Sequence, residues 1–124
     1  MAVEFTLTQE HPEGKPHTVV FHLAGWLDAQ NEGRVVEAVQ QAKDQGAQYV
    51  LLELGGLETI TSAGIRSIQK SWQVLMPKEA SSQPPRLKLC SASPRIFEVL
   101  SVTGVLIHMP MYESVDIAVD SFGK

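Results

Sequence analysis

Two adjacent hydroxyl residues, Thr61 and Ser62, precede an apolar helical pattern and are followed by Ala63 and Gly64. A side-chain oxygen at a helix start commonly accepts hydrogen bonds from the first backbone N–H groups, which stabilises the helix by about 0.5–2 kcal/mol. The same position tolerates an added phosphate, because those N–H groups are unpaired and the helix dipole is positive there. A plain helix cap and a reversible phosphorylation switch are therefore the two interpretations of this segment.

A phosphate on Ser62 would bring about −1.5 to −2 charges without breaking the helix. The fold would survive while the surface changed sign, which suits a reversible binding switch. We expect the small residues Ala63 and Gly64 to keep the approach to the Ser62 hydroxyl open.

A second candidate site is the segment Gly25-Trp26-Leu27-Asp28, which is expected to end a strand. Asp28 is either a turn or cap residue or an acidic group at a binding edge. Trp26 either shields the rim of the core or anchors a partner, since tryptophan is enriched among interface hot spots. Binding loops gather at the carboxyl ends of parallel strands. If the strand before this segment and the strand ending at Leu54 are parallel neighbours, Asp28 and Ser62 lie at the same edge.

Catalytic and metal-binding patterns are weak in this chain. The carboxylates Asp28, Glu53 and Glu58 have no spacing typical of acid–base catalysis, and no nucleophile–base pair is evident. The Gly55-Gly56 pair matches neither a P-loop nor a dinucleotide-binding fingerprint. The four histidines share no metal-ligand spacing, so we interpret them as structural or solvated. We therefore predict a binding protein without catalytic residues, metal or cofactor. His11 and His17 are expected in or beside a turn, and His22 and His108 within strands.

The composition is that of an ordinary globular protein, and we expect residues 1–124 to form one domain. The net charge is −4 and the basic residues are scattered, which does not favour nucleic acid as a partner. A single cysteine, Cys90, excludes an intrachain disulfide and is expected to be a small buried residue. The chain shows neither a signal-peptide pattern nor an apolar run near the roughly 18 residues that span a bilayer. We expect a cytoplasmic protein that does not insert into a membrane.

Hydrophobic periodicity predicts the element order β-β-α-β-α-β-α-β-α. The strands are expected over residues 4–9, 18–24, 49–54, 87–90 and 105–109. The helices are expected between residues 31 and 46, 61 and 76, 93 and 104, and 113 and 122. This order predicts an α/β fold whose mixed, mostly parallel five-stranded sheet carries an antiparallel edge hairpin and four helices.

Several local signals set the expected boundaries. Asn31 is a plausible cap of the first helix, and Gly55 with Gly56 is expected to open a turn. Ser93 followed by proline is a strong helix start, and Phe97 is expected to face inward with Leu100. Pro77 should end the second helix, and residues 78–86 should form a surface loop. The apolar stripe of the second helix comprises Ile65, Ile68, Trp72, Leu75 and Met76.

Four sequence blocks, in order and at matching spacing, resemble the STAS domain family and, within it, the stand-alone anti-sigma factor antagonists. The resemblance runs from about residue 18 to residue 119. The blocks correspond to the family's G-x-L-D turn, its hydrophobic strand with the D-S-[ST]-G segment, its Ser-Pro helix ending in L-x-x-T-G, and its terminal helix. They read LAGWLDAQN, YVLLELGGLETITSAGI, LKLCSASPRIFEVLSVTGV and MYESVDIAV.

The resemblance implies a partner-switching mechanism. In this family, an unmodified antagonist binds an anti-sigma factor that is also a serine kinase, and so frees the sigma factor. The kinase phosphorylates the serine of D-S-[ST]-G, and the antagonist then dissociates. A serine phosphatase removes the phosphate and so restores the binding form. ATP and magnesium belong to the kinase, so no cofactor is implied for this chain.

The family positions map onto Ser62 for the phosphorylated serine, Gly64 for the glycine and Asp28 for the acidic turn residue. Two positions depart from the motif, since the family's Asp is Thr61 here and its second hydroxyl residue is Ala63. This departure makes Thr61 a second possible acceptor. The expected partner-binding residues are Trp26, Asp28, Thr61, Ser62, Ala63, Gly64 and Arg66.

Two other functions stay open at this point. STAS domains also serve as interaction subunits without phospho-control, in signalling scaffolds or as accessories of lipid transporters. The altered D-S-[ST]-G segment is compatible with such a role. A third hypothesis is that this protein binds a nucleotide or another ligand at the Asp28–Ser62 edge.

Overall fold

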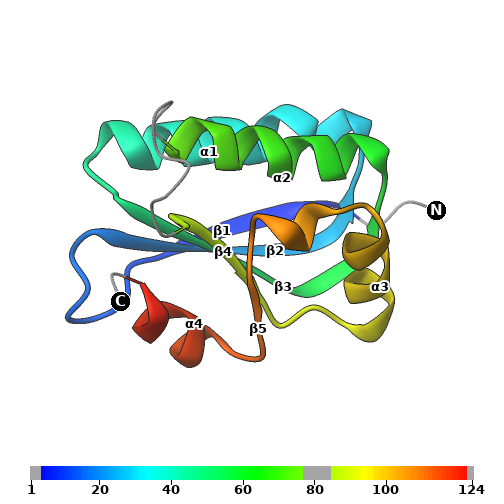
Figure 1. The fold of residues 1–124 in the computed structure, drawn as a ribbon. Coiled ribbons are helices and arrows are strands. Elements are labelled where there is room, and N and C mark those ends of the chain that lie inside the picture. Colours follow the sequence, from blue (N-terminus) through cyan, green and yellow to red (C-terminus); the bar gives the residue numbers. More distant parts are fainter. Residues whose placement is uncertain (1–3, 77–84, 123–124) are drawn as a thin grey trace.

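The structure is a computed structural model that describes residues 4–76 and 85–122 (Figure 1). One five-stranded sheet has the strand order β1-β2-β3-β4-β5, in which β1 and β2 are antiparallel and all later neighbours are parallel. This is the mixed α/β sheet with an antiparallel edge that the sequence predicts. The strands are β1 (Thr6–Glu10), β2 (Thr18–Leu27), β3 (Tyr49–Ile60), β4 (Leu87–Cys90) and β5 (Met111–Tyr112).

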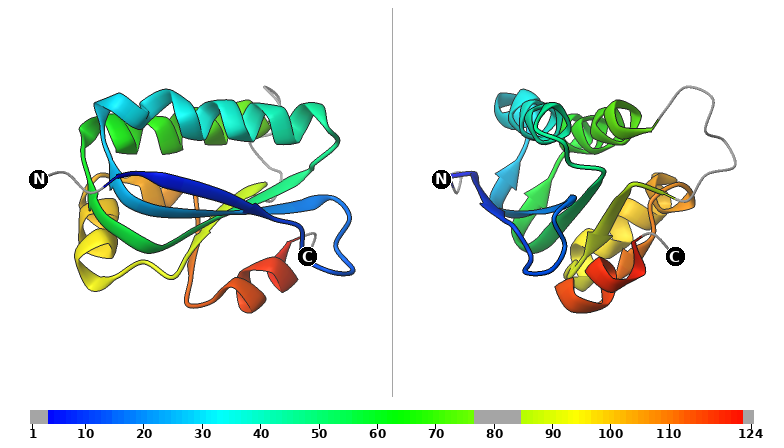
Figure 2. Two further views of the ribbon diagram at one scale, coloured as in Figure 1. Left: turned by 180° about the vertical axis from the view of Figure 1, so that it is seen from behind. Right: turned by 90° about the vertical axis from the view of Figure 1, so that its left-hand side faces the viewer.

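The helices lie on both sides of this sheet. Figures 1 and 2 show α1 and α2 side by side over one face, with α4 on the opposite side. The α-helices are α1 (Glu32–Asp44), α2 (Ser62–Leu75), α3 (Pro94–Val102) and α4 (Val115–Ser121). Two short 3₁₀ helices, η1 (Ala29–Asn31) and η2 (Val105–Ile107), complete the described elements.

Alternation along the strands divides the core into two clusters. In β2, Val19, Phe21 and Leu23 belong to the larger cluster, together with residues of α1 and α2. Val20, between them in sequence, packs in the smaller cluster with residues of α4. Because successive side chains of a strand point to opposite faces, one strand serves both layers. Each fully buried aliphatic side chain stabilises the fold by about 1.5–3 kcal/mol.

Two strands run further than the sequence predicts. β3 continues through Gly55 and Gly56 to Ile60, and the expected turn at the glycine pair is therefore wrong. The reason is pairing with β2, which also extends to Leu27 and shifts register twice along the way. A Cβ atom on Gly56 would lie 2.7 Å from the Cβ of Ala24, so glycine here permits close approach of two strands.

The predicted fifth strand at residues 105–109 is also wrong. Gly104 ends α3 with a φ of 82°, and the chain then forms η2, in which Ile107 N–H donates to the Gly104 carbonyl. A strand would bury Ile107 with Val105 and Met109, but the Ile107 side chain is 81% exposed. The strand beside β4 forms later, at β5, and His108 consequently lies outside any strand.

Other boundary signals have mixed outcomes. Ser93 caps α3 as expected, since its hydroxyl accepts from Ile96 N–H. Asn31 occupies the cap position of α1, but its side chain makes no capping hydrogen bond. The expectation that Phe97 faces inward is wrong, because Ile96 and Leu100 form the buried stripe of α3 and Phe97 is 44% exposed. Pro77 and most of the expected loop over residues 78–86 lie outside the described residues.

The predicted apolar stripe of α2 is confirmed in part. Ile68 and Leu75 are buried, whereas Ile65 and Trp72 are only partly buried against the core. Two serines, Ser67 and Ser71, also lie on the buried face. Their hydroxyls donate at 2.7 Å to the carbonyls of Gly64 and Ser67, so the helix itself satisfies them.

A histidine joins three strands on the sheet face opposite α1 and α2. Nδ1 of His22 lies 2.9 Å from a Glu53 carboxylate oxygen, and Nε2 lies 2.7 Å from a Glu10 carboxylate oxygen. Burial lowers the pKa of His22, but the hydrogen bonds to Glu53 and Glu10 outweigh it and raise the pKa above 6.5. Both ring nitrogens can donate only in the imidazolium form, so this arrangement favours the protonated ring.

We expect the stability that His22 contributes to depend on pH. A pKa raised by folding gives stabilisation that is fully present below the unfolded value near 6.5 and is lost as pH rises through the folded value. Chemical unfolding of the wild type and His22→Gln across this window measures the effect. The free-energy difference between the two proteins should be largest at acidic pH and shrink as pH rises. A difference that does not change with pH would contradict this assignment.

Candidate functional site

The carboxyl ends of β2 and β3 form one edge of the sheet, and both predicted site segments begin there. Leu27 pairs with Ile60 in parallel register, and Thr61 N–H donates to the Leu27 carbonyl at 3.0 Å. The two strands are parallel neighbours, so the condition for Asp28 and Ser62 to share an edge is met. Segments 34 residues apart in the chain therefore meet at the start of α2.

The two hydroxyl residues at the start of α2, Thr61 and Ser62, are exposed. Thr61 is the cap residue, with φ −102° and ψ 178°, but its side chain makes no capping hydrogen bond. Ser62, the first helical residue, is exposed, and the first turn carries no acidic side chain. The plain-cap interpretation is therefore not supported at Thr61. The positive end of a 14-residue helix lies beside an accessible hydroxyl.

Gly64 has a different role from the one expected. It is buried, and a Cβ atom there would overlap the Leu27 carbonyl oxygen and lie 2.8 Å from Cγ1 of Ile60. The glycine thus allows α2 to pack directly on the ends of β2 and β3. Ala63 is also buried. These two residues position the first turn of α2 against the sheet, so their small size is explained by packing and not by access to Ser62.

Asp28 organises the loop that faces this turn. Its Oδ1 accepts from Gln30 N–H at 3.1 Å and from Asn31 Nδ2 at 3.2 Å, which caps η1. Asn31 Nδ2 also lies 3.2 Å from the Trp26 carbonyl oxygen. The Asp28 carboxylate therefore orders this loop, which agrees with its interpretation as a turn or cap residue. Trp26 is partly buried and, by strand alternation, lies on the sheet face opposite buried Leu27.

Arg66 belongs to a charged cluster that links α1 and α2. Its Nη2 donates to Glu32 at 3.1 Å, and Nζ of Lys70 donates to the other carboxylate oxygen at 2.9 Å. Hydrogen bonds from Lys70 and then Arg66 hold the pKa of Glu32 below its usual value. Arg66 is among the residues predicted from the sequence to bind a partner, but Glu32 is not, because no local pattern connects residues on different helices.

Replacing Glu32 by glutamine should weaken the link between α1 and α2 only slightly. The ion pairs of Glu32 with Arg66 and Lys70 lie at the surface, where solvent and salt screen them. A pKa lowered by folding gives stability that is present above the unfolded value near 4.5 and lost as pH falls through the folded value. The free energy of unfolding of Glu32→Gln should therefore differ from the wild type at neutral pH and low salt. The difference should vanish at strongly acidic pH. A difference that persists there would show that Glu32 acts through something other than its charge.

The described residues contain no group of three or more His, Cys, Asp or Glu side chains able to hold a metal ion. The His22 cluster illustrates why: Glu10 and Glu53 bind opposite nitrogens of the ring, so their carboxylates cannot converge on one ion. Cys90 is buried, as expected, and burial raises the pKa of its thiol. Within residues 4–76 and 85–122, no helix is long and apolar enough to cross a membrane.

Known proteins resemble this chain over most of its length. The family model of the STAS domain matches residues 11–118. BtrV of Bordetella bronchiseptica, which is named as an anti-sigma factor antagonist, is 29% identical over 100 residues. That match covers 81% of this chain and 82% of BtrV.

Solved structures share the fold. An anti-sigma factor antagonist from Mycobacterium paratuberculosis superposes with a TM-score of 0.81 at 15% identity, covering 98% of this chain and 96% of that one. SpoIIAA in its unphosphorylated form gives 0.71 at 23% identity and covers 94% of both chains. The phosphorylated form of SpoIIAA from Bacillus gives 0.64 at 22% identity, covering 94% of this chain and 97% of that one. These TM-scores show a shared fold, and the match to the family model shows that the chain belongs to the STAS domain family.

Proposed function

We propose that this protein is an anti-sigma factor antagonist that binds an anti-sigma factor with serine kinase activity and is released by phosphorylation of Ser62. Two similarities support the proposal. BtrV carries the name of an anti-sigma factor antagonist, and SpoIIAA, which bears the same description, has been solved with and without phosphate. A partner of this kind would place the protein in the cytoplasm, where it would act as a binding module and not as an enzyme.

One observation carries the proposal furthest: Ser62 is exposed at the start of a 14-residue helix that packs beside the Asp28 loop. A phosphate there would lie against unpaired N–H groups and the positive helix end, which stabilise added negative charge. The same phosphate would place about −1.5 to −2 charges at the sheet edge where the Asp28 loop and the start of α2 meet. A partner that covers this edge in the unmodified state would then face a large new desolvation cost.

The proposed interface comprises the edge residues that lie around this hydroxyl. Thr61 is exposed, and Trp26 and Arg66 lie on neighbouring elements, with the Arg66 side chain more than half exposed. Ala63, Gly64 and Asp28 would act by holding the surface in shape, as their packing and hydrogen bonds indicate. The partner supplies ATP and magnesium, so this chain needs neither.

A phosphorylation assay tests the acceptor directly. Purified protein is incubated with the anti-sigma kinase from the same organism, ATP and magnesium, and the phosphosite is mapped by mass spectrometry. We expect stoichiometric phosphate on Ser62, none in Ser62→Ala, and normal incorporation in Thr61→Val. Phosphate on Thr61 would move the acceptor by one residue. Stable binding without phosphate on either residue would instead favour an interaction subunit without phospho-control.

A further inference from the structure

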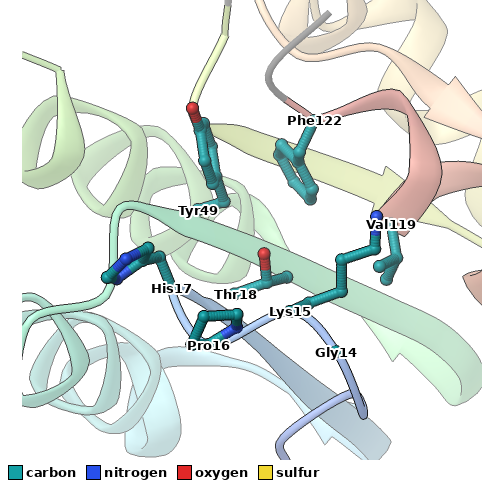
Figure 3. A pocket seen from close by; sticks show the side chains of 8 residues that line it. All are labelled: Gly14, Lys15, Pro16, His17, Thr18, Tyr49, Val119 and Phe122. Atoms are coloured by element: carbon teal, nitrogen blue, oxygen red, sulfur yellow. The ribbon is translucent and has the colours of Figure 1, made fainter.

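A pocket lies at the end of the sheet opposite Ser62. Its lining comes from the segment that leads into β2, the first residue of β3, and α4 with the residue after it (Figure 3). Thr18 and Leu27 are the two ends of β2, so the pocket and the Ser62 edge are separated by about 30 Å of strand. The pocket is lined by Gly14, Lys15, Pro16, His17, Thr18, Tyr49, Val119 and Phe122.

The pocket has an apolar wall built from aromatic and aliphatic side chains. The rings of Tyr49 and Phe122 stack with centroids 5.1 Å apart, and Val119 and Pro16 complete the wall. The volume is about 150 Å³. A cavity of this size holds one benzene-sized ring.

A polar group, the Thr18 hydroxyl, lies at the base of the pocket. Thr18 is only 4% exposed, and its side chain belongs to the pocket lining. Figure 3 shows this hydroxyl directed towards the Tyr49 and Phe122 rings. A ligand atom that accepts a hydrogen bond would pair with this hydroxyl in place of solvent.

A cation at the rim adds a second requirement. Nζ of Lys15 lines the pocket and lies 3.6 Å from the Asp120 carboxylate, in a pair whose two side chains are both exposed. Such a pair contributes little to stability, so an incoming carboxylate can take over the ammonium group. His17 also lines the pocket, and Figure 3 shows its imidazole on the other side of the view from the Lys15 ammonium. A ligand that matches this pocket therefore has one flat ring, a negative charge and an atom that accepts a hydrogen bond.

The lining is held in place before any ligand binds. Lys15 N–H donates to the Pro12 carbonyl, Thr18 N–H to the Lys15 carbonyl, and Tyr49 N–H to the His17 carbonyl, at 3.0 to 3.2 Å. These bonds fix the turn before β2 to the start of β3. A site formed in advance loses little entropy on binding.

We propose that this pocket binds a small aromatic carboxylate with a single ring. The ring packs against Phe122, Val119 and Pro16, while the carboxylate accepts from the Thr18 hydroxyl and pairs with the Lys15 ammonium. The site is separate from the Ser62 edge, so a test of ligand binding here does not depend on the proposed partner switch.

Benzoate is the probe for this site, and benzamide and acetate are its controls. Titration of the full chain with each compound, followed by ¹H–¹⁵N NMR, should give saturable shifts for benzoate at residues 14, 15, 17, 18, 49 and 119–122. Benzamide keeps the ring without the charge, and acetate keeps the charge without the ring. Both should bind at least about tenfold more weakly than benzoate, because a charged hydrogen bond or a buried ring is lost. No saturable shifts at these residues, or equal binding of benzamide and benzoate, would overturn the proposal.

Three variants separate the contributions. Thr18→Val should leave the fold intact, because it replaces only the hydroxyl by a methyl group, and should weaken benzoate binding about tenfold. Lys15→Gln should weaken binding of benzoate but not of benzamide, and Asp120→Asn should strengthen benzoate binding by freeing Lys15. Lys43→Gln, on α1 away from the pocket, is the control for a lost positive charge. A benzoate affinity that none of the three pocket variants changes would contradict the assignment.

Discussion

Replacing Ser62 by aspartate should reduce binding to the anti-sigma partner by at least about 30-fold, because an uncompensated charge in an interface costs about 2–5 kcal/mol. The fold should not suffer. Ser62 is exposed at the first position of α2, where an acidic group stabilises a helix by about 0.3–1 kcal/mol. Calorimetric titration with the partner and thermal unfolding of the same sample measure the two effects separately.

Two variants control for this result. Ser62→Ala removes the hydroxyl without adding charge and should bind the partner like the wild type. Gln41→Glu adds one negative charge at an exposed position near the far end of α1 and should also bind normally. If Ser62→Asp binds with wild-type affinity, or if Gln41→Glu weakens binding equally, charge at Ser62 is not the switch.

Replacing Gly64 by alanine should destabilise the fold by about 1–3 kcal/mol, since the added Cβ would overlap the Leu27 carbonyl oxygen. Backbone atoms on both sides of this contact leave no flexible side-chain end that could move away. The helix must shift from β2, which would also displace Ser62 at its first turn. Urea unfolding gives the free-energy change.

Gly33 provides the matched control, because it is also a helical glycine but has open space where a Cβ atom would lie. Gly33→Ala should stabilise the protein by about 0.5–1 kcal/mol through helix propensity alone. The two identical substitutions are therefore expected to have opposite signs. A neutral Gly64→Ala would show that α2 does not pack on β2 as tightly as the geometry requires.

Sequence pattern predicts the layers of this fold well. Alternation of short strands with helical stripes is enough to place a strand over residues 49–54 at the centre of a mostly parallel sheet, and parallel strands bring Asp28 and Ser62 to one edge. The exposed serine at a helix start is likewise visible in the sequence. These features depend on local periodicity, which a single chain records directly.

Features that depend on contacts between distant segments are not visible in the same way. The Gly55-Gly56 pair looks like a turn, but pairing with β2 carries the strand through it. Residues 105–109 have an apolar pattern that fits a strand or a helix. The left-handed backbone conformation of Gly104 turns the chain into η2 instead of a strand. The buried role of Gly64 depends on a carbonyl 37 positions earlier in the chain, so sequence alone assigns its small size to the wrong cause.

The most direct test of the partner switch is an affinity pull-down of the tagged protein from cells that produce it naturally. Mass spectrometry identifies the bound proteins and maps phosphate on both the bound and the unbound pools. We expect an anti-sigma kinase in the bound fraction, with Ser62 unmodified there and phosphorylated in the unbound pool. A transporter or scaffold partner, with no phosphate on Ser62 or Thr61 in either pool, would contradict this expectation.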